Sequence, residues 1–166
     1  MRNSRTTTRL LGVLFRASRS FLDFGAGNGM FVRMMRDAGF AFKYYDSHGP
    51  NIFAQGFESQ LDKESHFDVG TAFEVLEHLR RPVDELVSLV NSCDAVLATT
   101  LVLPEPPPTL DAWWYYALDG GQHVTRYTER SLDELASRLG FYAHRRAGFL
   151  PEVNPNPATA IFGGWA

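Results

Sequence analysis

The chain has 166 residues, of which 45% are hydrophobic and 21% charged, and this composition is typical of one globular domain with its own core. Its formal net charge of −3 gives no general electrostatic footprint for nucleic acid, so we expect no nucleic-acid partner. No apolar run approaches the roughly 20 residues that cross a bilayer, so we also expect no transmembrane segment.

The first twenty residues form a basic segment, with five arginines and no acidic residue. They include the short apolar run Leu10 to Phe15. We expect residues 1–20 to form a basic helix that packs beside the first strand, and residues 21–166 to form the domain. A transit peptide or a helix on a membrane surface is the alternative for this segment.

A glycine-rich turn follows, between a strand-like run and a helix-like run. Phe21 to Phe24 is apolar except for Asp23, glycines stand at positions 25, 27 and 29, and Met30 to Ala38 has helical spacing up to Gly39. A strand that turns into a helix through glycines lets a ligand lie against bare backbone, near the amides of the helix N-terminus. The stretch therefore predicts a cofactor cradle.

The spacing of the acidic residues and glycines limits which kinds of ligand this turn could bind. A dinucleotide fingerprint needs a sixth-position glycine, where this chain has Met30, and this disfavours a nicotinamide oxidoreductase. Asp23 would repel a pyrophosphate but attract an ammonium group. Asp46 ends the next apolar run, at the separation where a strand-end carboxylate binds ribose hydroxyls. A nucleoside with a cationic amino-acid tail fits both acids, and S-adenosylmethionine is such a molecule.

The rest of the chain alternates strand-like and helix-like segments. We expect strands over 42–45, 52–57, 67–73 and 95–100, and helices over 82–91 and 128–139. The first of these helices should bury Val83, Leu86, Val87 and Val90. The single cysteine, Cys93, cannot form an internal disulfide, which favours a reducing, cytoplasmic setting. Such alternation predicts a mostly parallel sheet covered on both faces, with ligands at the carboxyl ends of the strands.

Four ordered blocks resemble the class I S-adenosylmethionine-dependent methyltransferases, in particular the small-molecule subgroup of methyltransferase type 23. The blocks are Leu22 to Gly29, Asp46, Phe67 to His78, and Gly121 to Leu132. The resemblance implies an α/β, Rossmann-like, doubly wound single domain. Its seven-stranded sheet would be mostly parallel with an antiparallel last strand, and Phe141 to Gly148 would pair with Ala158 to Trp165.

The same resemblance implies the cofactor site, with S-adenosylhomocysteine as product. The expected cofactor-binding residues are Asp23, Phe24, Gly25, Ala26, Gly27, Asn28, Gly29, Asp46, Phe57, Phe73 and Glu74. The interval between Asp46 and Phe67 is too short for the usual helix, so residues 52–57 should serve directly as the third strand. This departs from the family pattern, so the resemblance does not fix the contacts to the base, for which Gly56, Phe57 and Glu58 are the candidates.

Candidate catalytic residues lie on two segments. His78 shares a helical face with Glu74, and a carboxylate beside an imidazole raises its basicity. His123 follows two glycines, and the resemblance places it over the acceptor pocket. Glu74, Glu77, His78 and His123 could also form a metal site, but the segment lacks the paired histidines of a zinc helix, so we expect no metal. Residues 113–116 are four consecutive aromatics, of which an extended chain would bury one pair and present the other.

We therefore expect a methyltransferase that acts on a small hydroxyl-bearing acceptor, with a sugar or sugar nucleotide as one candidate. The alternative is a non-catalytic subunit that keeps the cofactor cradle as a scaffold. The sequence does not indicate the oligomeric state.

Overall fold

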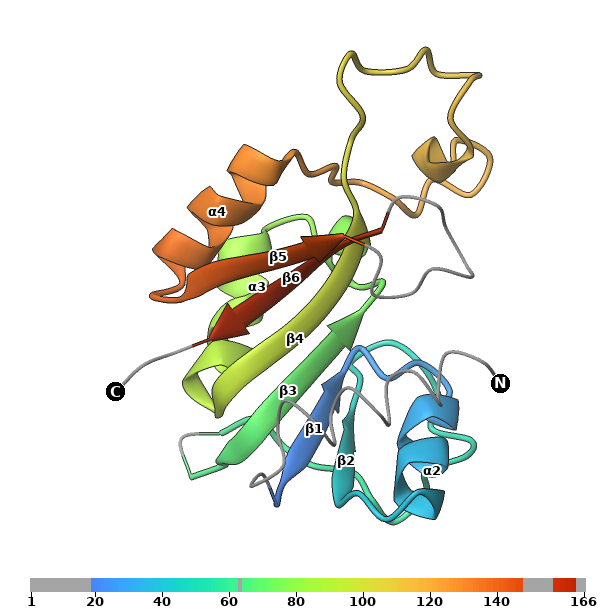
Figure 1. The fold of residues 1–166 in the computed structure, drawn as a ribbon. Coiled ribbons are helices and arrows are strands. Elements are labelled where there is room, and N and C mark those ends of the chain that lie inside the picture. The colour runs from blue at the N-terminus through green and yellow to red at the C-terminus, as the bar shows by residue number, and fades with distance from the viewer. Residues whose placement is uncertain (1–18, 63, 148–156, 164–166) are drawn as a thin grey trace.

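The computed structural model describes residues 19–62, 64–147 and 157–163. These parts form one sheet in the order β2-β1-β3-β4-β6-β5, flanked by helices (Figure 1). β2, β1, β3 and β4 run parallel, whereas β6 is antiparallel to both β4 and β5. The strands are β1 (Phe21–Phe24), β2 (Phe42–Tyr45), β3 (Phe67–Phe73), β4 (Cys93–Leu101), β5 (Tyr142–Ala147) and β6 (Pro157–Gly163). The helices are α2 (Met30–Asp37), α3 (Pro82–Asn91), α4 (Glu129–Arg138) and two short 3₁₀ turns, η1 (Leu76–His78) and η2 (Trp114–Tyr116).

Two apolar clusters cover the two faces of the sheet. Leu22 and Phe24 pack in a cluster with buried residues of α3 and α4, whereas Phe21 packs in a second cluster with Val32 and Met35 of α2. Successive strand residues point to opposite faces, so the apolar run of β1 supplies both clusters. A strand buried on both faces is what the sequence predicted for this sheet.

The expected helices are confirmed, but one residue that was predicted to be buried in α3 is exposed. In α3, Leu86 and Val90 are buried as expected, but Val87 is 46% exposed and Leu89 is buried in its place. α4 is capped by Thr128, whose side chain accepts a hydrogen bond from the Ser131 amide while Ser131 Oγ accepts one from the Thr128 amide. This reciprocal capping box satisfies amides that the first turn leaves open.

The expected third strand over residues 52–57 is wrong. The amides of Ile52 and Phe53 donate to the Asn28 carbonyl, so the segment folds as turns against the glycine loop. Its sheet pairing is limited to an isolated bridge between Tyr44 and Glu58. The described sheet therefore has six strands rather than seven.

The closing pair is confirmed as antiparallel, although the ends predicted for it at 148 and 164–165 lie outside the described residues. The basic helix expected over residues 1–20 also falls outside them, apart from Arg19 and Ser20. Within the described ranges, no helix is long and apolar enough to span a membrane. The long segment between β4 and α4, which carries η2, projects beyond the carboxyl ends of the parallel strands (Figure 1).

Candidate cofactor and acceptor site

The glycine loop connects the end of β1 to α2, and glycine is required at its positions for different structural reasons. A Cβ on Gly29 would lie 2.7 Å from Asn51 Oδ1 and 2.9 Å from Ala54 Cβ, so this glycine allows the 51–54 turn to pack closely. A Cβ on Gly27 would meet nothing within 4 Å, and its backbone has a φ of +55°. Gly27 therefore leaves open space beside bare backbone, which is the form of a ligand cradle.

Side chains from the end of β2 hold this loop in place. The amide of Gly27 donates to Asp46 Oδ2 at 2.8 Å, and the Tyr44 hydroxyl donates to the carbonyls of Gly27 at 2.8 Å and Gly49 at 3.0 Å. The sequence analysis missed Tyr44. It shares a face of β2 with buried Phe42, and a buried tyrosine hydroxyl needs a polar partner, so this signal was present.

Asp46 stands at the loop but is already engaged by the backbone. Its Oδ1 accepts hydrogen bonds from the amides of His48 and Gly49 at 2.7 and 2.6 Å. Burial by itself would raise the pKa of Asp46, but the Gly49, His48 and Gly27 amides lower it overall. The carboxylate is therefore ionised at neutral pH and fixes the turn that faces the cradle.

Asp23 lies beneath the loop and is only 4% exposed. Burial raises its pKa to about 7, with a further increase from the nearby Asp46 carboxylate. The Thr71 hydroxyl opposes this change by donating to Asp23 Oδ1 at 2.6 Å. A buried acid next to an ionised one gains most from a cationic neighbour.

The other residues expected to bind the cofactor have different positions. Phe24 and Ala26 are buried, and Phe73 is half-buried with its ring edge-on to Phe31. Asn28 is exposed, and its carbonyl holds the 52–53 turn. The Phe57 ring is covered by the Arg36 guanidinium at 3.5 Å, so it packs against α2.

A second polar group lies beyond the ends of β3 and β4. Glu74 has a φ of +53°, and its carboxylate accepts hydrogen bonds from Thr99 Oγ1 at 2.9 Å and from the Tyr115 hydroxyl at 3.2 Å. Glu77 is 1% exposed and accepts a hydrogen bond from Thr100 Oγ1 at 3.1 Å. Burial and the neighbouring Glu77 carboxylate raise the pKa of Glu74. The structure thus places two acids close together at the sheet edge where Gly27 also lies.

His78 and His123, the two histidines predicted as candidate catalytic residues, lie beside each other at this same place. Their rings lie 4.9 Å apart edge to face, and His78 Nδ1 is 3.0 Å from the Gln122 carbonyl. His123 Nδ1 is 2.7 Å from the Tyr115 carbonyl. A carbonyl only accepts, so in the neutral rings both Nδ1 atoms carry the proton and both Nε2 atoms keep a lone pair.

The aromatic run at residues 113–116 does not alternate as an extended chain would. Trp114 to Tyr116 form η2, which buries Tyr115 and leaves Trp114 69% exposed, while Trp113 and Tyr116 are half-buried. Tyr115 packs against His123 with the ring centres 4.3 Å apart and the ring planes tilted by 55°. One aromatic ring, rather than a pair, is therefore built into the site.

The sequence matches the model of the methyltransferase domain family over residues 2–145, which is most of the chain. The chain belongs to this family. It is a class I S-adenosylmethionine-dependent methyltransferase domain, as the four sequence blocks implied. No curated protein matches the sequence significantly.

Solved structures share the fold at low sequence identity. An O-methyltransferase family protein from Burkholderia thailandensis superposes with a TM-score of 0.73 at 13% identity, covering 98% of this chain and 56% of its own. The 1,6-didemethyltoxoflavin N1-methyltransferase from the same organism, solved with its substrate and S-adenosylhomocysteine, gives 0.73 at 16% identity, with 99% and 79% covered. Human N-acetylserotonin methyltransferase in complex with S-adenosylmethionine gives 0.69 at 15% identity, with 99% and 52% covered. The methyltransferase domain thus spans little more than half the length of several of these proteins.

The residues of the cradle fit S-adenosylmethionine. Open space at Gly27 admits a ligand against the backbone, and the buried acid Asp23 with the ionised Asp46 favours a cationic one. Both acids stand at the carboxyl ends of neighbouring parallel strands, where this class of sheet binds ligands.

Proposed function

We propose that this methyltransferase acts on a small hydroxyl-bearing acceptor bound beside Glu74, His78 and His123. The observation that carries the proposal is the meeting of two histidines, each with a free Nε2, at the sheet edge that bears the open glycine loop. Asp23, Asp46 and the residues 24–29 would hold the cofactor, and the projecting 104–126 segment would cover the acceptor.

The chain's own residues would bring the two reactants together and handle one proton. Bound in the cradle, S-adenosylmethionine supplies a methyl group on a positively charged sulfur. The glycine loop would fix the cofactor so that this carbon faces the acceptor oxygen, and Tyr115 would exclude water from one side. The Nε2 of His123 would take the hydroxyl proton as the oxygen bonds to carbon and the carbon–sulfur bond breaks.

The solved structures with a similar fold suggest which class of acceptor this protein could methylate. The related solved structures include a mitomycin 7-O-methyltransferase and the 1,6-didemethyltoxoflavin N1-methyltransferase. The neighbours thus give no support to a sugar. With the Tyr115 ring packed against His123, a planar acceptor with a ring hydroxyl fits the proposal best.

The test measures release of S-adenosylhomocysteine from S-adenosylmethionine in the presence of phenols, catechols, hydroxylated heterocycles and sugars. We expect turnover with a ring hydroxyl, and its loss in His123→Ala without loss of S-adenosylhomocysteine binding. Binding of the cofactor with no turnover on any acceptor would contradict catalysis and favour the scaffold alternative.

A further inference from the structure

We propose that Glu77, His78 and His123 bind a divalent transition-metal ion. One ligand atom from each residue, a carboxylate oxygen or a ring nitrogen, lies within 4.8 Å of the others. Two ligands that each lie about 2.1 Å from a shared ion are about 3.4 Å apart in tetrahedral geometry, so closure needs a shift of at most about 1.4 Å. The exposed His78 side chain can make this shift, because it lies at the surface.

The hydrogen bonds of the two imidazoles support this assignment independently of the cluster itself. A histidine that binds a metal usually donates its other ring N–H to a carbonyl or carboxylate, which fixes the tautomer and the ring orientation. His78 Nδ1 and His123 Nδ1 both have such a carbonyl partner, on Gln122 and Tyr115 respectively. Both Nε2 lone pairs are therefore available, on rings that are already oriented.

The burial of Glu77 supplies the second independent observation. This carboxylate is 1% exposed and stands beside Glu74, a second acid. Among the described residues, no ion pair involves Glu74 or Glu77, although exposed pairs occur elsewhere, such as Arg138 with Glu134. A buried carboxylate without a cationic side chain beside it is a position where a bound metal ion would be stabilised.

The backbone around Glu77 holds the three ligands in one place. Its carbonyl accepts hydrogen bonds from the amides of Val124 and Thr125, at 2.8 and 3.0 Å. Two segments far apart in sequence, one carrying His78 and the other His123, are thereby joined beside the Glu77 side chain. A metal bound here would have three protein ligands and open positions, as catalytic sites do.

The donor set indicates the class of ion. Two imidazole nitrogens and one carboxylate oxygen suit zinc, cobalt or iron(II), whereas magnesium, calcium and manganese prefer oxygen ligands. At an open position the ion would bind the acceptor hydroxyl and lower its pKa, so that the proton leaves to water. In the metal-bound state His123 would thus hold the ion instead of acting as the base. This role at the acceptor rests on the proposed function, but binding of the ion does not. This metal site differs from the expectation drawn from the sequence, which was that the protein binds no metal.

The experiment titrates Co²⁺ into the tag-free, chelator-treated chain and follows the visible absorption of the bound ion, with Zn²⁺ as competitor. We expect one Co²⁺ per chain, and at least 10-fold weaker binding in His78→Ala, His123→Ala and Glu77→Gln. His66→Ala is the matched control, because it removes an exposed histidine at the opposite edge of the sheet, and its Co²⁺ affinity should equal that of the wild type.

Equal Co²⁺ affinity in the wild type and the three ligand variants would overturn the proposal, as would the absence of a stoichiometric site. If Glu77→Gln does not fold by circular dichroism, the exposed His78→Ala still decides the outcome. Calorimetry with S-adenosylhomocysteine separates this inference from the proposed function: retained nucleoside binding without a Co²⁺ site contradicts only the metal, whereas loss of nucleoside binding in the wild type contradicts the cradle.

Discussion

At the scale of single residues, the cradle depends on Gly27. A valine here would fill the open space beside the loop and would also strain a backbone with φ +55°. We expect Gly27→Val to weaken S-adenosylhomocysteine binding by at least about 100-fold, which is about 2.7 kcal/mol, as measured by calorimetry. Gly39→Val is the matched control, because Gly39 also has a positive φ and open surroundings but lies beyond the end of α2. If both variants bind alike, the loop is not the cofactor site.

The raised pKa of Asp23 predicts how the free energy of unfolding changes with pH. Its folded pKa is about 7, against an ordinary value of 3.8, so the folded chain holds a proton that the unfolded chain loses. The stabilisation from this protonated acid is full below about pH 4 and is lost as pH rises to about 7. Its total is on the order of 4 kcal/mol, at about 1.4 kcal/mol per pKa unit. Asp23→Asn should therefore become more stable relative to wild type as pH rises, in urea unfolding at pH 4.5, 6 and 8. Parallel curves would contradict the buried, protonated acid.

The same residue predicts the pH dependence of the cofactor. A cationic amino-acid tail is attracted to the ionised carboxylate, so wild-type affinity for S-adenosylhomocysteine should rise as pH increases through about 7. Asp23→Asn should bind with an affinity that is nearly constant over this range. Calorimetry at pH 5.5 and 8 compares the two, and a matching dependence in both proteins would place the ammonium elsewhere.

At the scale of elements, periodicity located α2, α3 and α4 because each has an apolar stripe and terminal signals in its own sequence. It misplaced Val87 in α3, since the helix packs on both the sheet and α4 and the true stripe includes Leu89. Residues 52–57 were read as a strand because an apolar run has no intrinsic choice between a strand and packed turns. The partner that decides, the Asn28 carbonyl, is over twenty residues away.

In the site, as in the fold, the features that depend on neighbouring residues could be predicted, whereas those that depend on distant residues could not. The positions of the glycine loop after β1, of Asp23 and of Asp46 could be predicted because they follow from spacing along the chain. The approach of His123 to His78 could be only hypothesised, and the carbonyl partners of both rings could not be foreseen, because they depend on how η2 folds. The role of Tyr44 could have been predicted, because its hydroxyl lies on the buried face of β2 and needs a polar partner.

α4 provides a prediction that separates stability from binding. Thr128→Ala removes the side chain that caps this helix, so it should lower the free energy of unfolding by about 1 kcal/mol. Nucleoside affinity should be unchanged, since the capped turn belongs to neither the cradle nor the histidine cluster. Ser137→Ala, an exposed change in the last turn of the same helix, should cost nothing, because alanine is the better helix former. An equal cost in urea unfolding would contradict the capping argument.

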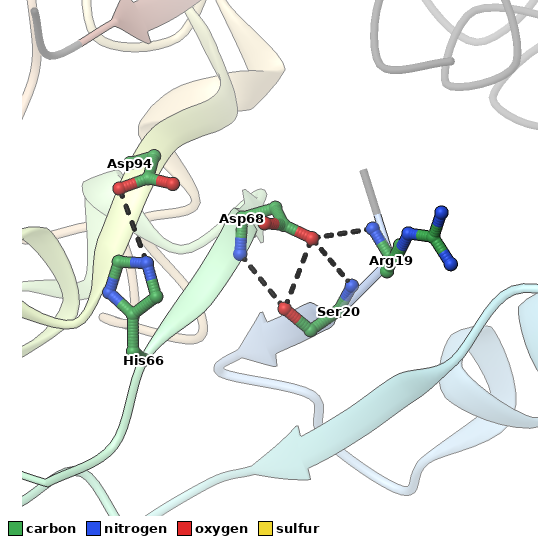
Figure 2. A network of polar contacts seen from close by, with 5 residues as sticks. All are labelled: Arg19, Ser20, His66, Asp68 and Asp94. Carbon is green, nitrogen blue, oxygen red and sulfur yellow. Dashed lines mark hydrogen bonds and ion pairs between the residues drawn. The ribbon is translucent and has the colours of Figure 1, made fainter. Parts of the chain in front are cut away.

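At the scale of the whole molecule, the two edges of the parallel sheet have different tasks. The carboxyl ends of the strands carry the cradle and the histidines, whereas the amino ends carry a structural network (Figure 2). There, Asp68 Oδ2 accepts hydrogen bonds from the amides of Arg19 and Ser20, and the Ser20 amide lies 2.8 Å away. These donors lower the pKa of Asp68, so the chain entering β1 is tied to β3 while this acid is ionised.

This division predicts different costs in stability for two aspartates that are drawn in Figure 2 and lie on the neighbouring strands β3 and β4. Asp68→Ala leaves two backbone amides without their acceptor and should lower the free energy of unfolding by about 1–2 kcal/mol. Asp94→Ala removes only an exposed pair with His66, whose side chain is 63% exposed, and should cost about 0.5 kcal/mol or less. Both variants should keep wild-type affinity for S-adenosylhomocysteine, because neither lies at the ligand-binding edge. Urea unfolding and calorimetry on the same samples check this, and a loss of affinity in Asp68→Ala would show that the two edges are coupled.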